Sequence, residues 1–117
     1  MTIVSIVLQI LLGLGFIMFG SMKFGSKQMV DEFQRYGYGS GFRLFTGLVE
    51  MIAAVLLLWG IWNGVAAVAG SLLVIGTMLG GILTHIKIKD PGSKLGMPII
   101  LLVLGIVVLL LNINAVI

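Results

Sequence analysis

Four apolar runs, each long enough to cross a lipid bilayer, make up most of this chain of 117 residues. A helix needs roughly 20 apolar residues to span the hydrocarbon core of a membrane. In chain order the runs are 3-IVSIVLQILLGLGFIMFGSM-22, 42-FRLFTGLVEMIAAVLLLWGI-61, 64-GVAAVAGSLLVIGTMLGGILTH-85 and 96-GMPIILLVLGIVVLLLNINAV-116. We therefore predict an all-α membrane protein, a four-transmembrane-helix bundle in which residues 1–117 form a single domain.

Composition narrows the chemistry that is open to such a chain. Hydrophobic residues make up 60% and charged residues 9% of it, and its mean hydropathy of +1.25 lies far outside the range of soluble domains. Cysteine is absent and there is a single histidine, so we expect no permanent metal or haem centre. The expected surroundings are the lipid bilayer. We expect no nucleic-acid partner, because membrane topology explains the net charge of +3 better.

The basic residues predict the orientation of the chain in the membrane. All seven Lys and Arg residues lie in or beside the first and third connections between the runs: Lys23, Lys27, Arg35, Arg43, Lys87, Lys89 and Lys94. Lys and Arg concentrate in the cytoplasmic loops of membrane proteins. We therefore predict a multi-pass protein of the cell membrane, with loops one and three in the cytoplasm and both termini outside.

The first connection carries the pattern of a short amphipathic helix over residues 26–36. Ser26 is suited to the N-cap and Gly37 to the position that ends the helix. The apolar residues between them follow helical spacing and are Met29, Val30, Phe33 and Tyr36. We predict that this helix lies at the membrane interface, between the first two spans.

One carboxylate, that of Glu50, interrupts the apolar run 46-TGLVEMIAAVLLLWG-60. A charged side chain at the centre of a membrane helix costs roughly 2.5–3.5 kcal/mol on insertion scales. Arg43 precedes Glu50 by about 10 Å along a helix, so Arg43 reaches the interface and Glu50 does not. We therefore expect Glu50 to face the interior of the bundle, beside a polar partner.

Polar residues on the first three spans indicate where that partner lies. Helical spacing places Lys23, Glu50 and His85 on the polar faces of their helices, in the cytoplasmic half of the bundle. We predict one inward-facing site around these three residues. The remaining ligand-binding candidates lie at neighbouring depths and are Thr46, Thr84, Phe16, Gly80 and Gly81.

Each of these residues also has a purely structural interpretation. Glu50 would pair with Lys23 or Arg43 and fix the helix packing. Lys23 would only anchor the topology, and His85 would only cap the end of its helix. The GxxxG pair that begins at Gly76 is more often a close-packing device than a ligand groove, and it would suit a homodimer.

Three segments together resemble one family of membrane proteins. The segment 15-GFIMFGSMKF-24 is similar to the G-F-x-x-x-G-x-x-K-F signature of the DoxX family, and 46-TGLVEMIAAVLLLWG-60 is similar to its T-G-x-x-E start of the second helix. The segment 83-LTHIKIKDP-91, followed by a last apolar helix, also resembles that family. The resemblance covers nearly the whole chain. It carries over two positions, Lys23 and Glu50, as the recurrent polar pair of the family.

The resemblance implies a connection with quinones. The founding member of the DoxX family is a small membrane subunit of a thiosulfate:quinone oxidoreductase, and other members are associated with quinone or catechol stress or with membrane assemblies that resist oxidants. We therefore expect a quinone-binding or oxidative-stress-associated membrane subunit, accessory to a redox system rather than an enzyme by itself. The lack of cysteine argues against direct sulfur chemistry by this chain.

In this interpretation a quinone is the candidate cofactor and a redox partner protein supplies the electrons. Lys23 or His85 would donate a hydrogen bond to a quinone carbonyl, and Glu50 would accept a proton on reduction. An apolar slot for the ring would come from Phe16, Phe19, Gly80 and Gly81.

Two other functions stay open at this point. The chain would serve as a structural or scaffold subunit if the polar residues only specify helix packing. It would serve as a proton-coupled small-molecule transporter if Glu50 exchanged a proton for substrate, although Lys23 beside it disfavours a cationic substrate.

Overall fold

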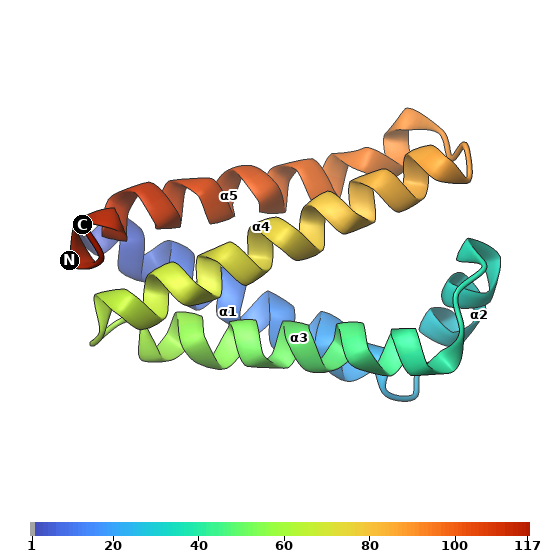
Figure 1. Ribbon diagram of the computed structural model, residues 1–117, viewed down its shortest axis with the longest axis horizontal. Coiled ribbons are helices and arrows are strands. Elements are labelled where there is room, and N and C mark those ends of the chain that lie inside the picture. The colour runs from blue at the N-terminus through green and yellow to red at the C-terminus, as the bar shows by residue number, and fades with distance from the viewer. Residues whose placement is uncertain (1) are drawn as a thin grey trace.

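The computed structural model describes residues 2–117 and is built from helices joined by short connections (Figure 1). The helices are α1 (Ile3–Lys23), α2 (Lys27–Tyr36), α3 (Ser40–Trp59), α4 (Gly64–Lys87) and α5 (Gly96–Asn112), with short 3₁₀ turns η1 (Gly92–Leu95) and η2 (Ile113–Ala115) around α5. Four helical segments are long and apolar enough to cross a membrane: α1, α3, α4 and the stretch containing α5. The predicted all-α bundle of four membrane helices is confirmed.

The four long helices pack as two pairs, α1 against α3 and α4 against α5, and α3 also packs against α4. Figure 1 shows the pairs meeting at the end that holds both chain termini and diverging toward α2. The diverging end carries Lys23, Lys27, Arg35, Arg43, Lys87, Lys89 and Lys94. We call it the basic end of the bundle.

Glycine holds α3 and α4 together at the end remote from α2. A Cβ placed on Gly60 would lie 2.7 Å from the Cα of Ala67, and one on Gly70 would lie 3.0 Å from the amide nitrogen of Leu57. Only a residue without a side chain allows backbones to approach this closely, as small residues do at many membrane helix contacts. The two helices therefore touch along their connected halves.

A similar contact joins α1 to α3 nearer the basic end. A Cβ on Gly20 would lie 3.0 Å from the carbonyl oxygen of Gly47, and a Cβ on Gly47 would lie 2.9 Å from the Cβ of Lys23. The close approach at these two glycines brings the last turn of α1 against the face of α3 that carries Glu50.

The core is apolar where the four helices converge. Its buried members are Leu12, Phe16, Ala53, Ala54, Leu57, Val74, Met78 and Val108. Large hydrophobic side chains also cover the outside of all four long helices, as expected for surfaces in contact with lipid.

A buried polar network ties α1, α3 and α5 together at the end remote from α2. Ser5 Oγ donates to Gln9 Oε1 over 2.6 Å, and Gln9 Nε2 donates to the carbonyl oxygen of Leu57 over 2.9 Å. Asn112 Nδ2 donates to Ser5 Oγ over 2.9 Å. Because lipid offers no hydrogen bonds, these side chains satisfy each other between the helices.

The predicted short helix between the first two spans is present as α2. Ser26 is its N-cap, and its Oγ accepts a hydrogen bond from the amide of Met29 over 3.1 Å. Gly37 ends the helix with φ of 84°, where glycine avoids the steric cost of a Cβ. The amide of Tyr38 then bonds the carbonyl of Phe33 over 3.0 Å, which completes a Schellman motif and directs Tyr38 back toward the bundle.

The contact at Gly60 predicts a specific loss of stability. Gly60→Ala should lower the free energy of unfolding by about 1–3 kcal/mol, because the new methyl group meets the backbone of α4. Gly15→Ala is the matched control, since a Cβ at Gly15 meets no atom within 4 Å. Thermal unfolding in detergent, followed by tryptophan fluorescence, should show a lower Tm for Gly60→Ala alone. Equal Tm values for the two variants would contradict the close contact.

Candidate functional site

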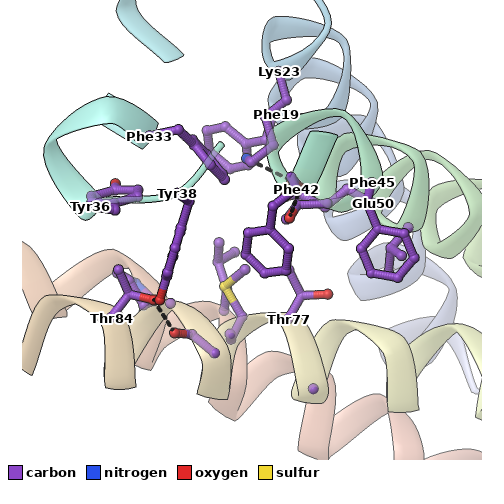
Figure 2. Close-up of a pocket in the computed structure, with 18 of the residues that line it drawn as sticks. Phe19, Lys23, Phe33, Tyr36, Tyr38, Phe42, Phe45, Glu50, Thr77 and Thr84 are labelled. Atoms are coloured by element: carbon purple, nitrogen blue, oxygen red, sulfur yellow. Dashed lines mark hydrogen bonds and ion pairs between the residues drawn. The ribbon is translucent and has the colours of Figure 1, made fainter. Parts of the chain in front are cut away.

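A cavity of about 680 Å³ occupies the space between the diverging helix pairs at the basic end. Residues of α1, α3, α4 and α5 form its walls, and α2 with the α2–α3 connection lies across its end. Aromatic side chains make up much of the wall: Phe19, Phe33, Tyr36, Tyr38, Phe42 and Phe45. Figure 2 shows these rings gathered around the space between α3 and α4.

An ion pair between α1 and α3 supplies the charged groups of the cavity wall. Lys23 Nζ lies 2.6 Å from Glu50 Oε1, and the two side chains are 13% and 2% exposed. Apart from Lys23, Oε1 of Glu50 has no hydrogen-bond partner among residues 2–117. Arg43 donates to the backbone carbonyl of Lys23 and so holds the end of α1 in place. The backbone that carries Lys23 is therefore held by Arg43, and the side chains of the Lys23–Glu50 pair line the cavity.

His85 lies in a different group of polar residues, at the mouth of the cavity. Its Nδ1 lies 2.6 Å from Asp90 Oδ2, while Arg35 Nη1 donates to Asp90 Oδ1 over 2.7 Å. Arg35 also pairs with Glu32 through Nη2 over 2.8 Å. We call these four residues the mouth cluster. The cluster joins α2 to the connection that follows α4.

Hydrogen bonds within the mouth cluster shift the titration of its carboxylates. The pKa of Asp90 falls to about 2, first because Arg35 donates to it and second because His85 does. The guanidinium of Arg35 likewise lowers the pKa of Glu32. Burial, followed by the charge of Glu32, raises the pKa of the neighbouring Tyr36 to about 12. At neutral pH both carboxylates are therefore ionised. Tyr36 keeps its proton, and its hydroxyl donates a hydrogen bond to Glu32.

The backbone at the end of α4 places Asp90 beside His85. The amide of Asp90 donates to the carbonyl of His85 over 2.9 Å, and the amide of Lys89 donates to the carbonyl of Ile86 over 3.1 Å. This is again a Schellman motif, with Lys89 at φ of 60° in the position that glycine usually takes. Pro91 follows and prevents the helix from continuing.

A second bridge crosses the mouth, from the α2–α3 connection to α4. The hydroxyl of Tyr38 lies 3.0 Å from that of Thr84, and Thr84 Oγ1 donates its only proton to the carbonyl of Gly80 over 2.8 Å. Tyr38 is therefore the donor to Thr84. Figure 2 shows the Tyr38 side chain reaching down to α4 in this way.

Three glycines of α4 give the cavity much of its width. A Cβ built on Gly76, Gly80 or Gly81 would meet no atom of the described chain within 4 Å, and all three line the cavity. The GxxxG pair Gly76–Gly80 therefore packs against no other helix within residues 2–117. It forms part of the cavity wall. The close contacts between helices of the chain occur instead at other glycines, among them Gly20, Gly47, Gly60 and Gly70.

The structure gathers most of the predicted site residues around one cavity. Those that line it are Lys23, Glu50, His85, Thr46, Thr84, Gly80 and Gly81. Lys23 and Glu50 are paired with each other, whereas His85 is paired with Asp90 in the mouth cluster.

Phe16, the remaining predicted residue, does not line the cavity. It is fully buried in the apolar core, because the helices have already converged at its depth, two turns before Lys23 on α1. Phe19, one turn nearer the basic end, is the phenylalanine of α1 in the cavity wall.

Several residues of the site were missed from the sequence. Asp90 and the aromatic residues Phe33, Tyr36, Tyr38, Phe42 and Phe45 bound the cavity or its mouth. Two local features of the sequence could have indicated these residues. The helix end at Gly37 turns the next residue back toward the bundle, and the Asp-Pro pair at residues 90–91 marks a helix end close to His85.

The fold and the site define a multi-pass membrane protein with an ion pair in the wall of a cavity at its basic end. The chain belongs to the DoxX-like family, whose family model matches residues 7–108. The matched range includes every residue of the cavity wall. No curated protein and no solved structure matches the chain.

The mouth cluster predicts a pH-dependent contribution of Asp90 to stability. Its pKa is lower in the folded protein than the ordinary value of 3.8, so its pairing stabilises the fold above that value and is lost as pH falls toward about 2. Asp90→Asn should therefore lower Tm at neutral pH, and its difference from wild type should shrink below about pH 4. Melting curves of both proteins between neutral and acid pH test this. A difference that stays constant down to the acid limit would contradict the pairing.

The Lys23–Glu50 pair predicts non-additive effects of substitution. Lys23→Met leaves a buried carboxylate without its cation, and breaking a buried pair in this way costs about 3–5 kcal/mol. The double variant Lys23→Met/Glu50→Gln removes both charges and should recover part of that loss. Unfolding of the two single variants and the double variant gives the coupling. Additive losses would show that the two side chains do not interact.

Proposed function

We propose that this DoxX-like protein binds the head of a quinone or quinol in its cavity, as an accessory subunit of a membrane redox system. The observation that carries the proposal is the Glu50 carboxylate. It lies in the cavity wall with 1% of the residue exposed, and its Oε1 is bonded only to Lys23 within residues 2–117. A buried, incompletely satisfied acid in a pocket is a typical feature of a binding site.

The size and walls of the cavity suit a planar aromatic ring. Ligand pockets usually measure roughly 300–1,000 Å³ and combine apolar walls with a few placed polar groups, and the cavity of about 680 Å³ falls in that range. Phe19, Phe42 and Phe45 offer faces and edges against which a ring packs favourably.

The ion pair suits an uncharged head with oxygen atoms. Lys23 and Glu50 neutralise each other, so a ligand with a net charge would have to give up its hydration without a counter-charge. The ammonium of Lys23 can donate a hydrogen bond to a carbonyl oxygen. The carboxylate of Glu50 can accept one from a hydroxyl, or take up a proton when a carbonyl is reduced to a hydroxyl.

The electrons for such a reduction would come from a partner protein. Neither an ammonium nor a carboxylate carries electrons, and the chain has no cysteine. The role proposed here is to hold the ring and move its protons. This matches the accessory place of the founding DoxX member in a quinone-linked oxidoreductase.

Organic extraction of the purified protein, followed by mass spectrometry, tests the proposal. We expect about one quinone per chain in wild type and at least a tenfold loss in Glu50→Gln, since one good hydrogen bond to a charged group is worth roughly 1.5–3 kcal/mol. Gly81→Leu fills the cavity from α4 and should give the same loss. Gly15→Leu is the matched control, because Gly15 also has open space around its Cβ but lies outside the cavity.

Two results would overturn the proposal. One is wild-type protein that neither retains a quinone nor binds one when a quinone is added back. The other is a Glu50→Gln variant that keeps its quinone and is only less stable, which would make the Lys23–Glu50 pair a packing element of a scaffold subunit.

A further inference from the structure

The cavity is open on one side along α4. Leu72, Gly76 and Gly80 follow each other at intervals of one helical turn, and all three both line the cavity and are exposed. The neighbouring row of Leu73, Thr77 and Gly81 also lines the cavity but is only partly exposed. The first row therefore forms a rim, and its two glycines leave that rim without side chains.

The opposite rim lies on α3. Phe42 and Phe45 line the cavity, and they are also 49% and 59% exposed. Their rings are stacked with centroids 6.3 Å apart, and Figure 2 shows both on α3 facing the α4 ribbon. We call the gap between these phenylalanines and the Leu72–Gly80 row the lateral opening.

The lateral opening lies at the depth of the lipid chains. Gly80 and Gly76 precede Lys87, at the basic end of α4, by about 10 and 16 Å along the helix axis. The hydrocarbon core is about 30 Å thick, so this part of the rim faces lipid tails.

The end of the cavity that faces the basic end is bridged instead. Tyr38 donates to Thr84, and Arg35 pairs with Asp90 over 2.7 Å, so both bridges run between the α2 region and the α4 end. A ligand moving in from the water would have to break these contacts. A ligand moving in from the bilayer meets the glycine rim.

We propose that the cavity receives its ligand sideways from the bilayer, and that this ligand is an amphiphile whose apolar chain stays in the lateral opening. Its uncharged head lies at Lys23 and Glu50, and its chain leaves between Phe45 and Gly76. This inference rests on the proposed function for the head. It adds that the natural ligand is a membrane quinone with a tail rather than a small aromatic compound from solution.

A pair of quinones that differ only in the chain tests the proposal. The tailless 2,3-dimethoxy-5-methyl-1,4-benzoquinone and its 6-decyl homologue are titrated into nanodiscs containing the protein, with each concentration expressed as mole fraction in the bilayer. Gly76→Leu narrows the lateral opening, and Gly15→Leu is the control, because Gly15 also has open space around its Cβ but does not line the cavity. Because Gly76 also lines the cavity, Gly76→Leu should weaken the binding of both quinones, but we expect the loss for the decyl homologue to exceed the loss for the tailless quinone by about tenfold or more.

A second measurement does not depend on any variant. A decyl homologue with a diazirine in its chain is photolysed in the wild-type nanodiscs, and the modified peptides are mapped by mass spectrometry. We expect modification at Phe45, Leu72 or Gly76, and competition by the unlabelled decyl homologue. A diazirine-labelled phospholipid should instead label the outer faces of all four spans without competition.

The outcomes separate this inference from the proposed function. If neither quinone binds to wild type, the proposed function fails and this inference fails with it. The sideways route is wrong, although the head site stands, if both quinones bind and Gly76→Leu weakens them equally. The same conclusion follows if both quinones bind and the chain label falls on residues outside the lateral opening.

Discussion

Direct backbone contact between α3 and α4 near their connection is the constraint from which the shape of this protein follows. Gly60 and Gly70 bring the two helices together there, with interatomic spaces too small for a side chain. Helices that touch along one half of their length diverge along the other, as the pairs in Figure 1 do. The space between the pairs becomes a cavity because α4 lines it with glycine instead of filling it.

The same divergence separates two kinds of polar contact. Where the helices converge, Ser5, Gln9 and Asn112 bond one another and neighbouring backbone carbonyls. Where they diverge, Lys23 and Glu50 bond across α1 and α3 but face open space on the side of α4. One region thus holds the bundle together, and the other places an ion pair in the wall of a cavity. We base the proposed quinone site on this contrast.

Much of the fold could be predicted because single helices carry their own signals. Hydropathy identified the four spans, Ser26 and Gly37 marked the ends of α2, and the cost of a lone carboxylate required a partner for Glu50. Lys23, one of the partners considered, is the observed one. In each case the relevant physics lies within one helix or in the solvation of one group.

The rest depended on distances between helices, which spacing along one helix does not contain. Phe16 and Phe19 both looked available on α1, and only the depth at which the bundle opens assigns Phe19 to the cavity. His85 was predicted to share one site with Lys23 and Glu50, and it lines the same cavity. The turn at Lys89, however, brings Asp90 beside His85, and Asp90 is its hydrogen-bond partner. Tyr38 was overlooked because its partner lies on another helix, 46 residues away.

The hydrogen bond from Asn112 to Ser5 joins residues that are 107 positions apart in the chain. Ser5 and Gln9 enter the membrane with the first helix, long before α5 has been synthesised. Ser5 and Gln9 bond each other and the carbonyl of Leu57 without α5, but until then they lack the amide of Asn112, which ties the last helix to them. The order of synthesis therefore makes insertion of the last span the step that completes assembly. A chain interrupted before α5 would lack the side-chain hydrogen bond that joins its first helix to its last, which distinguishes it from the finished protein.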